Sequence, residues 1–150
     1  MENQITGYLS TSIDSFRSQL SNWSVFAKEN YEKLKDFKDK VLEKTTKNQL
    51  EAQMQQDVLH HLDTMMSLVQ KDLMRPILKL DSELEQAKTA ASPGFSDKFQ
   101  TGYQLISNRV KEVNSSVAEL KRRSKHFIKR QEFGMRHGFY ANFRDVEMTH

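Results

Sequence analysis

The residues best suited to binding lie toward the C-terminal end of the chain, where cations are concentrated. Residues 121–130 contain six Lys or Arg. Residues 121–150 hold eight Lys/Arg against three Asp/Glu, an excess of five positive charges, although the whole chain carries only +3. Such a local excess indicates an anionic partner rather than a feature of the fold. The cations expected to contact it are Lys121, Arg122, Arg123, Lys125, Lys129, Arg130, Arg136 and Arg144.

Aromatic side chains accompany these cations, and we expect Phe133, Phe139, Tyr140 and Phe143 to act as anchors. Cations mixed with aromatics suit an anionic membrane, nucleic acid, whose bases stack on rings, or an acidic protein. The alternative is a solvated helix end whose cations favour the helix dipole, with the rings folded back onto the protein. Nucleic acid is the less favoured partner, because no helix-turn-helix is visible and the rest of the chain is not basic.

The remaining residues offer little catalytic chemistry. The chain has no cysteine, which excludes thiolate catalysis and Cys-ligated zinc. It also lacks a glycine-rich phosphate loop and a nucleophile elbow. Asp57 lies four residues before His61, which follows His60, so Asp57 and His61 could face one metal from one helix; such a site needs another ligand, and the sequence selects none. We therefore predict a non-enzymatic protein without catalytic residues, cofactor or metal site.

Long amphipathic helices are expected to position these residues. Steps of three and four residues from Leu9 to Val41 predict one continuous helix, from about Asn3 to Lys44, with a single apolar seam. Such a seam is unstable in water unless another helix covers it. Its one polar member, Asn30, is either buried and paired, which would fix the register, or hydrated where the bundle opens. The seam comprises Leu9, Ile13, Phe16, Leu20, Trp23, Ala27, Asn30, Leu34, Phe37 and Val41.

A second helix is predicted from about Asn48 to Ala90, after a turn at residues 45–48. Its seam repeats the steps of three and four but shows consecutive steps of four around Val69 to Ile77. Pro76 coincides with this stutter; it lacks an N–H and its ring clashes with a preceding carbonyl, which predicts a kink or a break. The seam comprises Leu50, Met54, Val58, Leu62, Met65, Val69, Leu73, Ile77, Leu80, Leu84 and Ala87.

A third helix is predicted after the boundary at residues 89–94, with Ser92 as N-cap and Pro93 at the first helical position. We expect it to fade near Phe133–Gly134, and Tyr103 could take the place of Gly102 in its seam. The seam comprises Phe95, Phe99, Gly102, Ile106, Val110, Val113, Val117, Leu120, Ser124 and Phe127.

Three long helices with short links predict an all-α fold. We expect an elongated, antiparallel, up-down-up three-helix bundle with coiled-coil-like heptad packing over residues 1–133, and a basic, aromatic tail over residues 134–150. The alternative is a dimer in which two chains pool their helices. This architecture resembles that of BAR membrane-shaping modules and of spectrin-like repeats, which also place a tryptophan in the first seam, as Trp23 is placed here.

The second helix is apolar over more than one face. This width suits either a central helix that touches two neighbours or a spare surface for self-association or a partner, and methionine adapts to irregular surfaces. The residues expected to bind a protein partner are Met65, Met66, Leu68, Met74 and Leu78.

The sequence therefore predicts a helical scaffold or adaptor module that binds other proteins. The alternatives are a BAR-like peripheral membrane protein and a nucleic-acid-associated protein. No apolar run approaches the roughly 18–20 residues that span a bilayer, and the N-terminus lacks a signal-peptide pattern. We expect a cytoplasmic location, with a membrane-peripheral one as the alternative.

Overall fold

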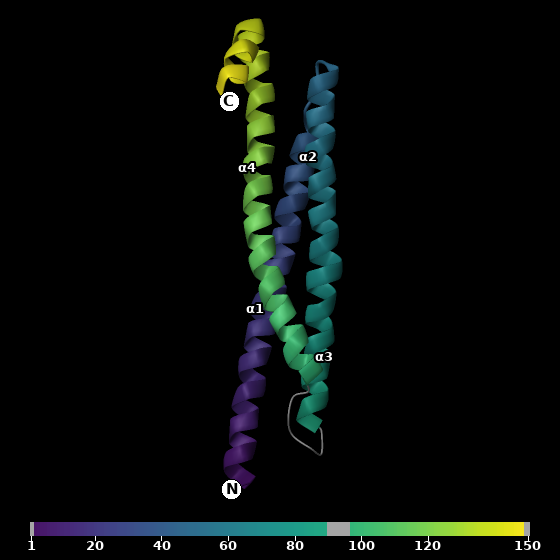
Figure 1. Cartoon of the computed structure of the whole chain (residues 1–150), viewed down its shortest axis with the longest axis vertical. Helices are drawn as coiled ribbons and strands as arrows, with labels where there is room; N and C mark the ends of the chain where they lie inside the picture. The colour runs from purple at the N-terminus through teal and green to yellow at the C-terminus, as the bar shows by residue number, and fades with distance from the viewer. Residues whose placement is uncertain (1, 90–96, 149–150) are drawn as a thin grey trace. The chain divides into compact units, whose positions relative to one another are not determined.

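The computed structural model describes the backbone of residues 2–89 and 97–148, and the side chains of residues 13–87 and 97–130. All regular structure in these backbone ranges is helical, which confirms the predicted all-α class. The first helix is α1 (Glu2–Glu43). The second comprises α2 (Gln49–Leu68), the π-helical segment η1 (Val69–Met74) and α3 (Arg75–Thr89), and the third is α4 (Asp97–Met148). Figure 1 traces them in this order.

The chain divides into two compact units, and each of the three helices contributes to both. Unit 1 comprises Met1–Tyr31 and Ser67–Asn114, and unit 2 comprises Glu32–Met66 and Ser115–His150. Unit 1 therefore contains the first part of α1, η1 with α3, and the first part of α4. Unit 2 contains the rest of α1, nearly all of α2 and the rest of α4.

The turn between α1 and α2, in unit 2, is held by polar side chains. The Asn48 side chain accepts a hydrogen bond from the Glu51 N–H at 2.8 Å, and the Glu51 carboxylate accepts one from the Lys47 N–H at 2.7 Å. This arrangement resembles a capping box and explains why α2 begins without glycine or proline. From α2, the Gln55 amide donates to the Val41 and Lys44 carbonyls, both at 2.9 Å, which satisfies the C-terminal end of α1.

The predicted stutter lies in η1. The Arg75 N–H donates to the Gln70 carbonyl, five residues earlier, so this turn holds more residues than an α-helical turn. Val69, Leu73 and Ile77, spaced by four, are all buried. The helical backbone continues through Pro76 into α3 without a break. The π-helical turn thus accommodates the extra residue of the stutter. It ends two residues before Pro76, which cannot donate a backbone hydrogen bond.

The predicted seams form the cores of both units. In unit 1, Phe16 and Trp23 of α1 contact Tyr103 of α4, with ring centroids 4.9 and 4.8 Å apart, and Phe16 also meets Phe99 edge-on at 5.3 Å. These rings pack in the offset and edge-to-face geometries that aromatic pairs prefer. The other buried apolar residues of unit 1 are Ile13, Leu20, Ala27, Val69, Leu73, Ile77, Leu80, Leu84, Ile106 and Val113.

Tyr103 and Gly102 both lie in packed positions of α4, but they contact different helices. Tyr103 packs on α1, whereas a Cβ added to Gly102 would lie 3.3 Å from Leu80 Cδ2 on α3. Tyr103 therefore packs in the core as the sequence suggested, but it does not replace Gly102, which contacts a different helix. The absent side chain at Gly102 permits this close approach to Leu80.

In unit 2, the core contains Leu34 and Val41 from α1, Leu62 from α2, and Leu120 and Phe127 from α4. Val58, Leu59 and Val117 are also buried, and Lys38 Nζ pairs with Asp63 Oδ1 at 2.8 Å near the surface. Ser124 is fully buried, and its hydroxyl lacks a hydrogen-bond partner among the described residues.

Four details differ from the sequence predictions. The backbone of α4 continues to Met148, so the helix does not end near Phe133–Gly134. Leu50 is 64% exposed because it lies in the first turn of α2, beyond the packed part of the seam, while Leu59, outside the predicted seam, is buried. Asn30 is buried, but its amide donates to the Phe26 carbonyl of its own helix at 2.8 Å, so this bond does not link helices.

Three features predicted from the sequence belong to residues that the structure does not describe. The Leu9 side chain, Ser92 with Pro93, and Phe95 lie outside the described residues.

Candidate functional site

The apolar residues predicted on the second helix fall into both units, and most are partly covered. Met65 and Met66 of unit 2 are half-buried, as are Leu68 and Met74 of unit 1. Leu78 of unit 1 is 67% exposed. The structure therefore leaves one large side chain of this set open to solvent.

The predicted cations of residues 121–130 separate into a free row and a packed group. Lys121, Lys125 and Lys129 follow one another at one helical turn, are exposed, and make no ion pair with any side chain described for residues 13–87 and 97–130. Arg122 pairs with Glu119 at 2.6 Å. This side-chain hydrogen bond lowers the pKa of Glu119 and raises that of Arg122.

The two remaining arginines of this stretch lie against α2 within unit 2. Arg123 Nη1 is 2.8 Å from His61 Nδ1, and Arg130 Nη1 is 3.8 Å from Met54 Sδ. A guanidinium can only donate, so His61 Nδ1 must be the acceptor in this bond. Arg123 and Arg130 are half-buried and less available to an external anion than the lysine row.

The rest of the predicted C-terminal site lies outside the described side chains. Arg136, Arg144, Phe133, Phe139, Tyr140 and Phe143 belong to this part.

Asp57 and His61, the pair considered as possible metal ligands from the sequence, have separate partners. Asp57 accepts a hydrogen bond from Gln53 at 3.0 Å, while His61 faces Arg123. Within the described residues, no three His, Asp or Glu side chains come together as a metal site would require. The same part of the chain contains no helix long and apolar enough to cross a membrane.

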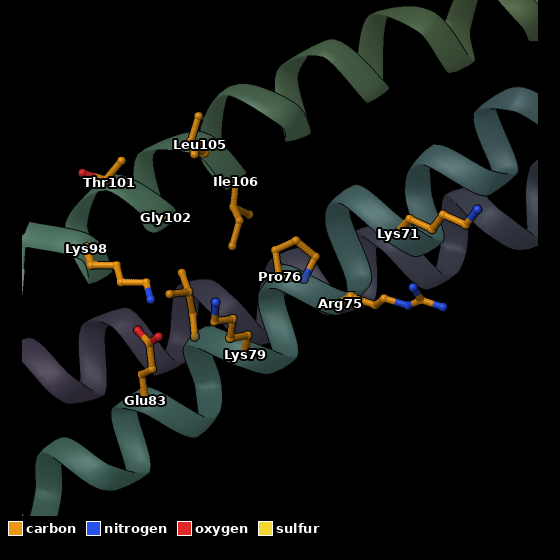
Figure 2. Close-up of a pocket in the computed structure, with 11 residues that line it drawn as sticks. Lys71, Arg75, Pro76, Lys79, Glu83, Lys98, Thr101, Gly102, Leu105 and Ile106 are labelled. Carbon is orange, nitrogen blue, oxygen red and sulfur yellow. The ribbon is translucent and has the colours of Figure 1, made fainter.

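A groove in unit 1 was not anticipated from the sequence. It has a volume of about 520 Å³ and lies between η1 and α3 on one side and α4 on the other (Figure 2). This volume is within the usual range of ligand sites, about 300–1,000 Å³. Its apolar lining is formed by Pro76, Leu80, Gly102, Leu105 and Ile106.

Charged residues line the same groove. Lys71, Arg75 and Lys79 follow one edge at steps of four residues, and Lys98 lies on the α4 edge. None of these four cations makes an ion pair with the side chains described in residues 13–87 and 97–130. Glu83 is the acidic residue of the lining, and Figure 2 shows it and Lys98 reaching toward the same end of the groove. Four cations against one carboxylate give the groove a net positive charge.

Two features of the sequence hinted at this groove. The row Lys71, Arg75 and Lys79 occupies one helix face, and Leu105 lies outside the predicted seam. Leu105 is 62% exposed and forms part of the groove lining. Only the packing of α3 on α4 shows that the row and the leucine belong to one surface.

No protein-family model, curated protein or solved structure matches the chain. The groove of unit 1 and the row Lys121, Lys125 and Lys129 are therefore the candidate binding sites.

Proposed function

We propose that this protein is a non-enzymatic helical interaction module that binds an acidic protein partner through the groove of unit 1. The observation that carries the proposal is the set of four cations around an apolar lining, none of which forms an ion pair with a described side chain. Unpaired cations at the rim attract and orient an acidic partner. The exposed Leu105 side chain gives that partner apolar area to bury.

The scaffold of this module is an antiparallel, up-down-up three-helix bundle with heptad packing. Contacts inside unit 2 support this topology: Arg123 lies beside His61, and Arg130, seven residues later, lies beside Met54, seven residues earlier. Between α1 and α4 in unit 1, Phe16 meets Phe99 and Trp23 meets Tyr103, so these two helices run in the same direction. Such a module suits a scaffold or adaptor in the cytoplasm.

A peptide-selection experiment tests the function without presuming a partner. Random peptides displayed on phage are selected on the full chain and on the variant Lys79→Glu/Lys98→Glu. We expect acidic sequences to be enriched on the native protein and lost on the variant, because the variant reverses charge on both edges of the groove. A matched control, Lys28→Glu, changes an exposed lysine of α1 in unit 1 and should select the same peptides as the native chain. Identical selection by native and groove variant would contradict the proposal.

A second function, binding to an anionic membrane, is favoured by the row Lys121, Lys125 and Lys129. Each cation near an anionic surface contributes about 1 kcal/mol. Reversing all three to Glu should abolish pelleting with phosphatidylserine vesicles at low salt. Reversing Lys33, Lys35 and Lys40, exposed on α1 of the same unit, is the matched control. Equal pelleting by both triple variants would exclude this role for the row.

A further inference from the structure

The spacing of the cations restricts what the groove of unit 1 can bind. Lys71 and Lys79 are eight residues apart, which is roughly 10 Å along the helix axis. A single phosphate or carboxylate needs donors that converge on one point. Cations spread along an edge instead match an extended ligand with several negative charges in a row.

The charge of the groove also argues against a second copy of this chain as its occupant. Two copies meeting groove to groove would bring together eight cations and only two carboxylates, twice the set that lines one groove. Like charges facing each other at an interface repel and oppose association. The occupant must therefore supply the negative charge that the groove lacks.

The lining favours a ligand that also carries apolar side chains. Leu80 and Pro76 from α3, with Leu105 and Ile106 from α4, supply the apolar part of the lining beside these cations. Phosphate backbones of nucleic acid would contact the cations and leave this surface unused. A groove between two packed helices instead suits an amphipathic helix that inserts side chains at steps of three and four residues.

We infer that the groove binds an acidic amphipathic helix of a partner protein. Its apolar face enters between α3 and α4, and its carboxylates, spaced by one turn, face Lys71, Arg75, Lys79 and Lys98. This inference rests on the proposed function and adds to it the conformation and the charge pattern of the partner segment.

Three synthetic peptides of equal length test the inference by fluorescence anisotropy with the full chain. The first is a hydrocarbon-stapled helix with Leu along one face and Glu on its flanks. The second has the same sequence except that two prolines, which prevent helix formation, replace two alanines outside the apolar face. The third is the stapled helix with Lys in place of every Glu. We expect the first to bind about tenfold or more tightly than either of the others, because preorganisation and charge complementarity both act in its favour.

Charge reversal locates the binding site. The variant Lys79→Glu/Lys98→Glu should weaken the acidic helix about tenfold or more and strengthen the Lys-containing helix. Lys28→Glu should leave both affinities unchanged. Circular dichroism of each variant reports whether it is folded, and the gained affinity for the Lys-containing helix cannot arise from misfolding.

The outcomes separate the inference from the proposed function. If acidic phage peptides are selected but the proline-containing peptide binds as tightly as the stapled helix, the function stands and the helical partner is wrong. If binding of the acidic helix is unaffected by Lys79→Glu/Lys98→Glu, the site is wrong. If phosphatidylserine vesicles alone are bound, with the loss of binding tracking the groove variant, the groove is a lipid site and the inference is overturned.

Discussion

The buried hydroxyl of Ser124 has no hydrogen-bond partner among the side chains and backbone that the structure describes, and the energetic cost of burying it can be measured. Burying an unsatisfied hydroxyl costs about 1–3 kcal/mol, and alanine is the better helix former. We therefore predict that Ser124→Ala raises the free energy of unfolding by about 1 kcal/mol in urea denaturation. Ser115→Ala, on the exposed surface of the same helix, should give only a few tenths of a kcal/mol from propensity. A destabilised Ser124→Ala variant would show that the hydroxyl has a partner.

Tyr103 combines a packed ring with a phenol whose ionisation is disfavoured. Burial raises the pKa of Tyr103 above its ordinary value. The folded state therefore holds this proton more tightly than the unfolded state does, so the contribution to stability is complete below the ordinary tyrosine pKa and is lost as the pH rises through the folded pKa. We predict that Tyr103→Phe removes a component of the tyrosinate absorbance titration that lies above the ordinary tyrosine pKa, and that it reduces the alkaline loss of stability. An unchanged titration curve would contradict this assignment.

At the scale of the element, η1 accommodates one residue more than the alternation of three and four along the second seam requires. Removing one residue from Val69–Met74 would restore the alternation of three and four along the second seam. We predict that deleting the exposed Gln70 together with Pro76→Ala gives a fully helical, folded protein with stability near that of the native chain, measured by circular dichroism and thermal unfolding.

The control for this deletion removes exposed Asn114 from α4, where the seam from Val110 to Phe127 alternates between steps of three and four. That change shifts every later seam residue by about 100° around the helix, and we expect it to destabilise the protein by several kcal/mol through loss of core packing. Equal effects of the two deletions would show that η1 does not absorb an extra residue.

The seams of these elements were predictable because burial follows helical periodicity. Leu20, Leu62, Leu73 and Val113 are buried as their spacing indicated. The fate of Leu50 was not predictable, since periodicity does not say which end of a seam lacks a covering neighbour. Pro76 signalled an irregularity, but only the hydrogen bonds of the backbone show that it is a π-helical turn and not a break.

At the scale of the molecule, the candidate groove depends on the packing of two helices against each other. Lys79 and Lys98 belong to different helices, and Leu80 of α3 lies close to Gly102 of α4 in the lining that they share. Local patterns describe one helix at a time, so the sequence pointed to the dense cations after residue 120 and missed the sparser ones in unit 1.

In unit 2, we expect α1 and α2 to run antiparallel with their apolar seams packed together. The chain has no native cysteine, so spin labels can be introduced cleanly at exposed Lys35, Gln53 and Thr64 of unit 2. Pulsed electron resonance on the pairs Lys35–Thr64 and Lys35–Gln53 is the most direct test. We expect the Lys35–Thr64 distance to be shorter than the Lys35–Gln53 distance, because Gln53 lies about 16 Å further along α2. A Lys35–Gln53 distance shorter than the Lys35–Thr64 distance would contradict the antiparallel packing of α1 and α2.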